Sequence, residues 1–267
     1  MAAVERSIIR WAGSKKKLLP VLRAVAPKQY QRYIEPFCGS ICFYVDQQPT
    51  RAILSDNNSE LIQFYKSLSY RPLHIGKLAH AMPNTERYYY ELRNIDPSTL
   101  SANDRAARFL YLNRFCFNGV YRTNKSGRFN VPRGSHMGAL PELEEIQNFG
   151  RLIRSASFYA ADFETILDMA GHGDFVYLDP PYAGRDVRDR GEYGANAFKE
   201  PDIQRLADSC HRASARGAKV LLSYADIRAI QELMDGWNIH RLSVPRSVSG
   251  FARGRTTVNE ILVSNYS

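Results

Sequence analysis

Four consecutive residues, Asp179, Pro180, Pro181 and Tyr182, have the types and order needed to act on an amino group. The Asp179 carboxylate and the Pro180 carbonyl accept hydrogen bonds, and the Tyr182 ring offers a stacking face for a planar substrate such as adenine. The adenine amine is a poor nucleophile because its lone pair is delocalised into the ring, and two acceptors on its hydrogens favour the reactive, pyramidal state. Such assistance is preorganised electrostatic catalysis. The alternative interpretation is a proline turn with a capping aspartate and a core tyrosine.

The residues just before Asp179 predict a strand that positions this group. Phe175 to Leu178 form a short apolar run, typical of a parallel strand that is covered on both faces. The two prolines lack N–H groups and fix φ, so the strand cannot continue. We therefore expect the four residues at the carboxyl end of a strand, where open α/β sheets bind ligands.

A second motif predicts a site for a nucleotide-like cofactor. Residues 33–35 are expected to form a strand, and 36–40 a loop in which Gly39 allows close approach of the backbone. The next strand, 52–55, is followed by Asp56, about 17 residues after Gly39, close to the spacing at which an acidic residue meets ribose hydroxyls in related folds. The alternative role of Asp56, the N-cap of a helix over 59–68, is better filled by Asn57 or Asn58.

The alternation of strands and helices predicts an α/β fold with an insert. Further strands are expected at 157–160, 219–224, 239–244 and 258–263, and a helix at 163–169. From about 70 to 150 the alternation stops, and the apolar spacing in 86–92 and 105–115 is typical of short amphipathic helices. We therefore expect a doubly wound, Rossmann-like catalytic domain at 1–60 and 151–267, and a mainly helical insert at 61–150. A chain of 267 residues with 44% hydrophobic residues can bury such a core.

Composition narrows the class of partner. The net charge of +9 and the pI near 9.4 indicate a polyanion. No apolar run approaches the ~20 residues of a membrane span, and residues 1–17 lack the apolar core of a signal peptide, so we expect a cytoplasmic protein without a membrane partner. The four cysteines include one close pair and the six histidines are scattered, so we expect reduced thiols and no metal site.

The insert holds a basic stretch, 105–133, that has no acidic residue. Its cations are Arg105, Arg108, Arg114, Arg122, Lys125, Arg128 and Arg133, and its aromatic residues include Phe115, Phe117, Tyr121 and Phe129. Cations pair with phosphates, and aromatic side chains fill the gap left by an extruded base, so the stretch predicts contact with duplex DNA. A solvated basic face, or a small helical core that uses the aromatic residues, is the alternative.

Together these motifs resemble the Dam family of DNA adenine-N6 methyltransferases, the D12 class of the α group. The resemblance covers nearly the whole chain and follows the order of motifs in that group, with the target-recognition region between the first motif and the last. The motifs that carry it are IEPFCG at 34–39, YLNRFCFNGVYR at 111–122, GRFNVP at 127–132 and DPPY at 179–182. The family usually has a second glycine, in the pattern EPFxGxG, whereas this chain is one residue shorter there.

The resemblance implies an enzyme that takes a methyl group from S-adenosyl-L-methionine and transfers it in line to N6 of adenine in double-stranded DNA, leaving S-adenosyl-L-homocysteine. In that family the tryptophan packs on the adenosine end of the cofactor and the lysine lies near its methionine carboxylate, positions filled here by Trp11 and Lys15. A basic helix face is the alternative for Lys15. The cofactor-binding residues implied in this way are Trp11, Ala12, Gly13, Lys15, Glu35, Pro36, Phe37, Gly39, Ser40, Asp56, Asp162 and Asp179.

The same resemblance implies a DNA-reading hairpin and a flipped target base, with GATC as the expected site. Arg122 would contact a guanine through two hydrogen bonds, Phe117 would wedge at the flipped adenine, and Asn118 would hold its unpaired partner. The other implied DNA contacts are Arg114, Asn124, Arg128, Pro132, Arg246 and Arg253, and Phe198 matches an aromatic residue of the target-base pocket. We expect a monomer without an obligate protein partner. Methylation of another amine, such as cytosine N4, and a DNA-binding module that has lost catalysis remain alternatives.

Overall fold

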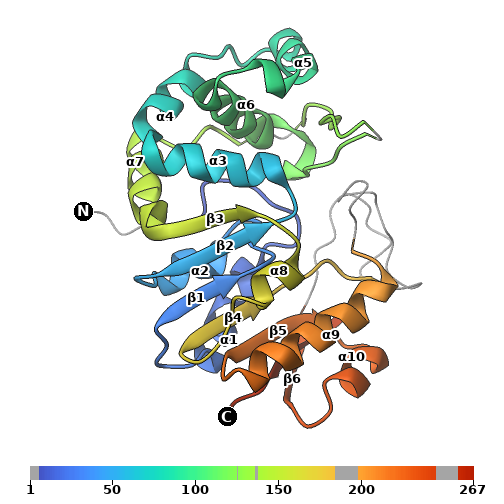
Figure 1. The fold of residues 1–267 in the computed structure, drawn as a ribbon. Helices are drawn as coiled ribbons and strands as arrows, with labels where there is room; N and C mark the ends of the chain where they lie inside the picture. The colour runs from blue at the N-terminus through green and yellow to red at the C-terminus, as the bar shows by residue number, and fades with distance from the viewer. Residues whose placement is uncertain (1–5, 125, 136–137, 184–197, 245–257) are drawn as a thin grey trace.

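The computed structural model describes residues 6–124, 126–135, 138–183, 198–244 and 258–267 (Figure 1). Among these residues, seven strands form one sheet in the order β3-β2-β1-β4-β5-β7-β6. The strands are β1 (Arg32–Glu35), β2 (Ala52–Asp56), β3 (Ala156–Ala160), β4 (Asp174–Leu178), β5 (Lys219–Ala225), β6 (Asn238–Val244) and β7 (Val258–Ser264). Every strand predicted from the sequence is confirmed, with bounds shifted by a residue or two.

The direction of the strands decides where a ligand can bind. Neighbouring strands from β3 to β5 are parallel, whereas β7 runs antiparallel to both β5 and β6. The chain builds β1, β2 and β3 on one side and then crosses to β4 and β5 on the other, so the strand order reverses between β1 and β4. In doubly wound sheets the crevice at such a reversal holds the ligand. The predicted α/β, Rossmann-like fold is confirmed.

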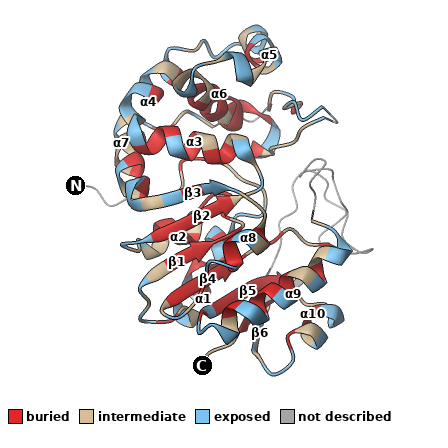
Figure 2. Cartoon of the chain, viewed as in Figure 1, coloured by how far each residue is buried: buried red, intermediate tan, exposed pale blue. Residues whose placement is uncertain are grey.

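Helices cover both faces of the sheet. On one face lie α1 (Leu19–Val25), α2 (Cys42–Gln47) and α3 (Ser59–Tyr70), and on the other α8 (Phe163–Leu167), α9 (Glu200–Ala215) and α10 (Arg228–Leu233). Successive side chains of a strand point to opposite faces, so Phe175 and Tyr177 of β4 join the first layer while Val176 and Leu178 join the second. Figure 2 shows the central strands as almost wholly buried, which explains their continuous apolar runs.

The helices of the insert stack beyond the edge strand β3, with α3 between (Figure 1). They are α4 (Pro72–His80), α5 (Glu86–Asn94), α6 (Ala102–Phe115) and α7 (Leu143–Leu152), and the short 3-10 turns of the chain are η1 (Lys15–Leu18), η2 (Pro97–Thr99), η3 (Phe117–Gly119) and η4 (Ile153–Ser155). Buried residues of α4, α6 and α7 such as Ile75, Phe109 and Phe149 belong to the same apolar cluster as the sheet. The predicted helices at 86–92 and 105–115 are confirmed, and Asn58 caps α3 as expected.

A glycine lets α7 approach the junction of α3 and α4. A Cβ at Gly150 would lie 2.4 Å from Pro72 Cβ and 2.8 Å from the carbonyl oxygen of Leu68. A proline ring and a helix backbone cannot move aside as a flexible side chain does. At Gly76 in α4, by contrast, an added Cβ would meet only the ends of Leu143 and Ile146, at 3.0 and 3.2 Å.

We expect Gly150→Ala to lower the free energy of unfolding by about 1–3 kcal/mol, since overpacking outweighs the ~1 kcal/mol by which alanine favours a helix over glycine. Gly76→Ala is the matched control and should change stability by less than about 1 kcal/mol. Urea unfolding of the three proteins measures both effects. A Gly150→Ala protein as stable as the wild type would contradict the close packing of α7.

Candidate active site

Three segments that lie far apart in the sequence meet around the ammonium group of Lys15. The Lys15 Nζ atom lies 3.0 Å from Asp179 Oδ1 and 3.5 Å from Glu260 Oε2, and it donates a hydrogen bond of 3.2 Å to the Tyr182 hydroxyl. The lysine side chain is only 7% exposed. Burial disfavours its charged form, but the acidic groups of Asp179, Tyr182 and Glu260 outweigh burial, so the pKa of Lys15 is raised and the side chain stays an ammonium ion.

The predicted Asp-Pro-Pro-Tyr turn follows directly on β4, as the sequence indicated. The side chain of Asp179 is 20% exposed and Pro180 is buried. After the turn, the backbone N–H of Ala183 donates to the Tyr224 hydroxyl of β5 at 2.9 Å, and the rings of Tyr182 and Tyr224 lie 5.2 Å apart. The turn is therefore held from the neighbouring strand and has little freedom to reorganise.

The glycine loop lies under Trp11 and beside Asp56. Gly39 has a φ of +44°, and a Cβ there would come within 2.8 Å of the Trp11 ring. The N–H of Gly39 donates to Asp56 Oδ2 at 3.1 Å, and Ser40 Oγ donates to Ser14 Oγ at 3.2 Å. The structure thus brings together the Trp11 turn, the glycine loop and the acidic residue at the end of β2, which the sequence assigned to one cofactor site.

The shortened loop turns into α2 through an unusual residue. Ile41, at the N-cap, has a φ of +50°, which β-branched side chains rarely adopt. Its side chain is fully buried, and its N–H donates to the Cys38 carbonyl at 2.7 Å. The loop closes without the second glycine of the family pattern.

Glu35 ends β1 inside the core rather than on its surface. It is 3% exposed and accepts a hydrogen bond from the Tyr33 hydroxyl at 2.9 Å. Burial raises the pKa of Glu35 well above its ordinary value, in spite of the Tyr33 hydrogen bond, and the charges of Asp179 and Asp56 raise it further. Burial in this position therefore disfavours the charged form of Glu35.

Asp162 caps helix α8 and forms a salt bridge with an arginine. It accepts from the N–H of Glu164 as the N-cap of α8, and it pairs with Arg205 at 2.9 Å. The Phe37 ring stacks on the adjacent Phe163, 5.3 Å away, and Phe198 lies 6.0 Å from Phe37. An aromatic group thus lines the side of the site next to Asp162.

The hairpin predicted in the insert is formed by two antiparallel pairings that follow α6, Cys116 with Arg133 and Thr123 with Phe129 (Figure 1). The Phe117 ring is 48% exposed, and Asn118 beside it is exposed with a φ of +53°. Packing among the described residues does not explain why this large aromatic side chain is so exposed.

Other predicted DNA contacts lie on the same hairpin. Arg122 donates through Nε to Asn130 Oδ1 at 2.9 Å, which fixes the plane of its guanidinium group. The Asn124 side chain accepts from the N–H groups of Ser126 and Arg128, so it shapes the tip of the hairpin. Pro132 is exposed, and its carbonyl accepts from the N–H of Phe117. Arg246, Arg253 and Lys125 lie outside the described residues.

Several arginines of the basic stretch are engaged inside the protein. Arg105 forms a salt bridge with Glu60 of α3, and Arg108 is buried and donates to the carbonyls of Leu92 and Arg93. Arg114 donates to the carbonyls of Ala139 and Ile8, so it joins two backbone segments. Part of the charge of 105–133 is therefore compensated by long-range partners, and the contact of this stretch with DNA stays a prediction.

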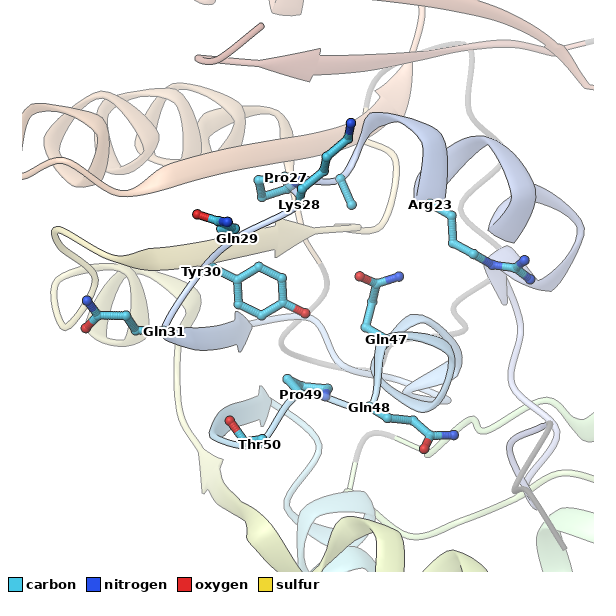
Figure 3. Close-up of a pocket in the computed structure, with 11 residues that line it drawn as sticks. Arg23, Pro27, Lys28, Gln29, Tyr30, Gln31, Gln47, Gln48, Pro49 and Thr50 are labelled. Atoms are coloured by element: carbon cyan, nitrogen blue, oxygen red, sulfur yellow. The ribbon is translucent and has the colours of Figure 1, made fainter.

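A pocket of about 540 Å³ lies at the opposite edge of the sheet, among the residues that lead into β1 and β2 (Figure 3). Its lining is mostly neutral and polar, and includes Gln29, Gln31, Gln47 and Gln48 around the Tyr30 ring. Of the described residues, none that the sequence assigned to a site lines it. Within the described ranges there is also no group of three or more metal-ligating side chains and no helix long and apolar enough to cross a membrane.

The fold and this site define the class: an α/β protein with a doubly wound sheet, whose Asp-Pro-Pro-Tyr turn lies beside the reversal of strand order at which such sheets bind nucleotide-like ligands. The sequence pattern described as "D12 class N6 adenine-specific DNA methyltransferase" matches residues 11–248. The chain belongs to this family and is an S-adenosylmethionine-dependent, adenine-specific DNA methyltransferase.

Characterised relatives match along almost the whole chain. The type II methyltransferase M1.LlaDCHI of Lactococcus lactis subsp. cremoris is 32% identical, over 98% of this chain and 95% of its own length. A DNA adenine methylase of Vibrio cholerae is 31% identical, over 97% of this chain and 95% of its own. A DNA N-6-adenine-methyltransferase of Escherichia phage P1 is 34% identical over 98% of this chain, which corresponds to 35% of that longer protein. Among solved structures, a SAM-dependent methyltransferase of Agrobacterium tumefaciens aligns over 93% of this chain and 59% of its own with a TM-score of 0.37 and 11% identity, too distant to add weight.

Sequence reasoning missed Glu260, which faces Lys15 from β7. A single signal was present: a glutamate directly before the apolar run Ile261-Leu262-Val263 in the predicted strand 258–263. A buried charge in such a strand requires a partner.

The burial of Asp56 gives a prediction about pH. Desolvation raises its pKa from 3.8 to about 6, although the N–H groups of Asn58 and Gly39 oppose the shift. Because the folded state holds this proton more tightly than the unfolded state, the stabilising effect is complete below about pH 4 and is lost as the pH rises through about 6. The loss amounts to about 3 kcal/mol at 1.36 kcal/mol per pKa unit.

In Asp56→Asn this pH-dependent contribution to the free energy of unfolding disappears. The free energy of unfolding of the wild type, minus that of Asp56→Asn, should therefore fall by about 3 kcal/mol between pH 3 and pH 7. Taking the difference between the two proteins cancels the titration of the other groups. A difference that stays constant or rises with pH would show that Asp56 is not buried in this way.

Proposed function

We propose that the enzyme flips an adenine out of double-stranded DNA into the Asp179–Tyr182 turn and methylates its N6 atom, with GATC as the target site. The observation that carries this proposal is the position of Asp179, at the carboxyl end of β4, beside the reversal of strand order and 3.0 Å from the buried Lys15. We further propose that it acts in the cytoplasm as a monomer without a protein partner, which light scattering on the purified protein tests.

The residues around the glycine loop fit S-adenosyl-L-methionine. The cradle left by the missing Cβ of Gly39, the Trp11 ring over it and the Asp56 carboxylate offer a close backbone approach, a flat apolar cover and an acceptor for ribose hydroxyls. When bound, this cofactor supplies a methyl group on a positively charged sulfur. The remaining proposed contacts come from the Trp11 turn, the glycine loop and the N-cap of α8, and they are Ala12, Gly13, Lys15, Glu35, Pro36, Phe37, Ser40 and Asp162.

The chemistry asked of the protein is alignment and proton handling. The Asp179 carboxylate and the Pro180 carbonyl accept hydrogen bonds from the two hydrogens of N6, which holds the amine in its reactive form. Asp179 is then placed to take the proton that N6 releases once it has gained the methyl group. No covalent bond to the protein is needed, and the buried thiols fit this: burial raises the pKa of Cys42 to about 11, so it is not a nucleophile at neutral pH.

We expect Asp179→Ala to lower the rate of methyl transfer by at least about 100-fold, because a preorganised acceptor at the reacting atom is lost. Its affinity for DNA should stay within a few-fold, since the carboxylate acts on the flipped base and not on phosphates. Methylation of a GATC duplex, followed by mass spectrometry of the nucleosides, measures rate and product together. Asp235→Ala, at an exposed position, is the control. Turnover of Asp179→Ala within tenfold of the wild type would refute the role of Asp179.

The hairpin provides a test that separates base reading from phosphate contact. If Arg122 spans two acceptors of a guanine, Arg122→Ala should lose about 1–3 kcal/mol on the cognate site and relax discrimination at that one base pair. Lys16→Ala, at an exposed position, should weaken cognate and non-cognate DNA alike and make the salt slope shallower by about one unit. Methylation of single-base variants of GATC at two salt concentrations compares them. An equal loss on every variant would make Arg122 a backbone contact.

A further inference from the structure

The glutamate that faces Lys15 comes from the one antiparallel strand at this edge. Glu260 lies near the start of β7, opposite Ala225 of β5 and Leu242 of β6. Parallel strands present their last residues at the carboxyl edge of the sheet, whereas an antiparallel strand presents its first. Glu260 is therefore brought to the edge that carries Asp179, and its side chain is only 3% exposed.

We propose that Glu260 is a positioning residue that shares the Lys15 ammonium with Asp179 and so keeps the catalytic carboxylate from being neutralised by the lysine alone. The proposal rests on the function proposed for Asp179. Lys15 has three N–H donors, and three acceptors face it: Asp179, Tyr182 and Glu260. An ammonium held between two carboxylates leaves each of them a better acceptor for a further donor, here the N6 amine, than an ammonium paired with only one.

The distances show that Glu260 competes with Asp179 for the Lys15 ammonium. The Coulomb energy of two charges is inversely proportional to their separation. The attraction energy between Glu260 and the ammonium at 3.5 Å is therefore about six sevenths of that between Asp179 and the ammonium at 3.0 Å. Lys15 is too deeply buried to swing into solvent. With Glu260 made neutral, the ammonium would settle on Asp179.

Burial also acts on the other titratable groups around Asp179. Burial raises the pKa values of Glu35 in β1 and Tyr177 in β4 well above their ordinary values, and that of Cys42 in α2 to about 11. Lys15 and Glu260 face the turn directly, and the carboxyl groups of Glu35 and Asp56, at the ends of β1 and β2, are the further acidic groups of this edge. A change in the charge of Glu260 should be felt directly by Asp179.

The test is Glu260→Gln, which keeps the shape of the side chain and removes its charge. We expect two changes together: the rate at the pH plateau falls at least tenfold, and the acidic limb of the rate profile moves to lower pH. The limb moves because a like charge makes a carboxyl harder to ionise, so its removal lets Asp179 ionise sooner. Carbon NMR of the protein alone should show the same displacement in the titration of the Asp179 carboxyl. General damage to the fold would lower the rate without moving the limb.

Three further variants make the test specific. Asp174→Asn breaks the salt bridge to Arg32 at the opposite edge, between atoms 2.7 Å apart, and should lower stability without moving the acidic limb. In a Lys15→Met background, Glu260→Gln should shift the limb less than in the wild type, because the shared ammonium is gone. Glu260→Asp keeps the charge but draws it back by one carbon, and should give a smaller shift in the same direction. If Glu260→Gln does not fold, Glu260→Asp replaces it as the test variant.

The outcomes separate this inference from the proposed function. If Glu260→Gln or Glu260→Asp keeps its plateau rate within threefold and its limb in place, while Asp179→Ala is inactive, Glu260 is only structural and the inference is overturned. If Asp179→Ala remains active, the proposed function itself is wrong. A lower rate, a limb at lower pH and a matching NMR titration support both.

Discussion

The structure of the site depends on one buried positive charge. The Lys15 ammonium is almost wholly removed from water and is kept charged by acidic neighbours. An unpaired ammonium at this depth would cost several kcal/mol, so carboxylates have to be brought to it. They come from the ends of two strands, at Asp179 and Glu260. Since these residues are far apart in the sequence, the site is complete only when the sheet is complete, and the stability of the sheet and the geometry of the catalytic group are linked.

The antiparallel strand β7 and the two prolines after β4 together place two carboxylates at the same edge of the sheet. Asp179 must lie just past the end of β4, and the prolines stop the strand there, while Tyr224 of β5 holds the turn from the next strand. Glu260 faces it from near the start of β7, which lies at this edge because β7 runs antiparallel to β5. Both groups therefore sit on rigid elements and need little rearrangement on binding, as electrostatic assistance to a reacting amine requires.

Local patterns predicted most of the fold, and long-range pairing accounts for what they missed. The strands follow from short apolar runs, and the cap of α3 follows from Asn58, since both depend on neighbours in the sequence. The partner of Arg105 is Glu60, 45 residues away, so the charge of the basic stretch was overestimated when acidic residues were counted only within it. Glu260 was missed in the same way. A charged residue in a run of this kind signals that a partner exists, but only the topology of the sheet shows which one.

The shortened glycine loop shows that burial of a side chain can offset an unfavourable backbone conformation. Without a second glycine, the chain enters α2 through Ile41 at a φ of +50°, a conformation that costs about 1–2 kcal/mol for an L-residue. Full burial of that side chain contributes about 1.5–3 kcal/mol in the opposite direction. The two effects are of similar size, so packing of the Ile41 side chain can hold the loop in shape without a glycine at this position. Gly39 itself has a left-handed conformation and a hydrogen bond to Asp56, so the first part of the loop is fixed by its own backbone.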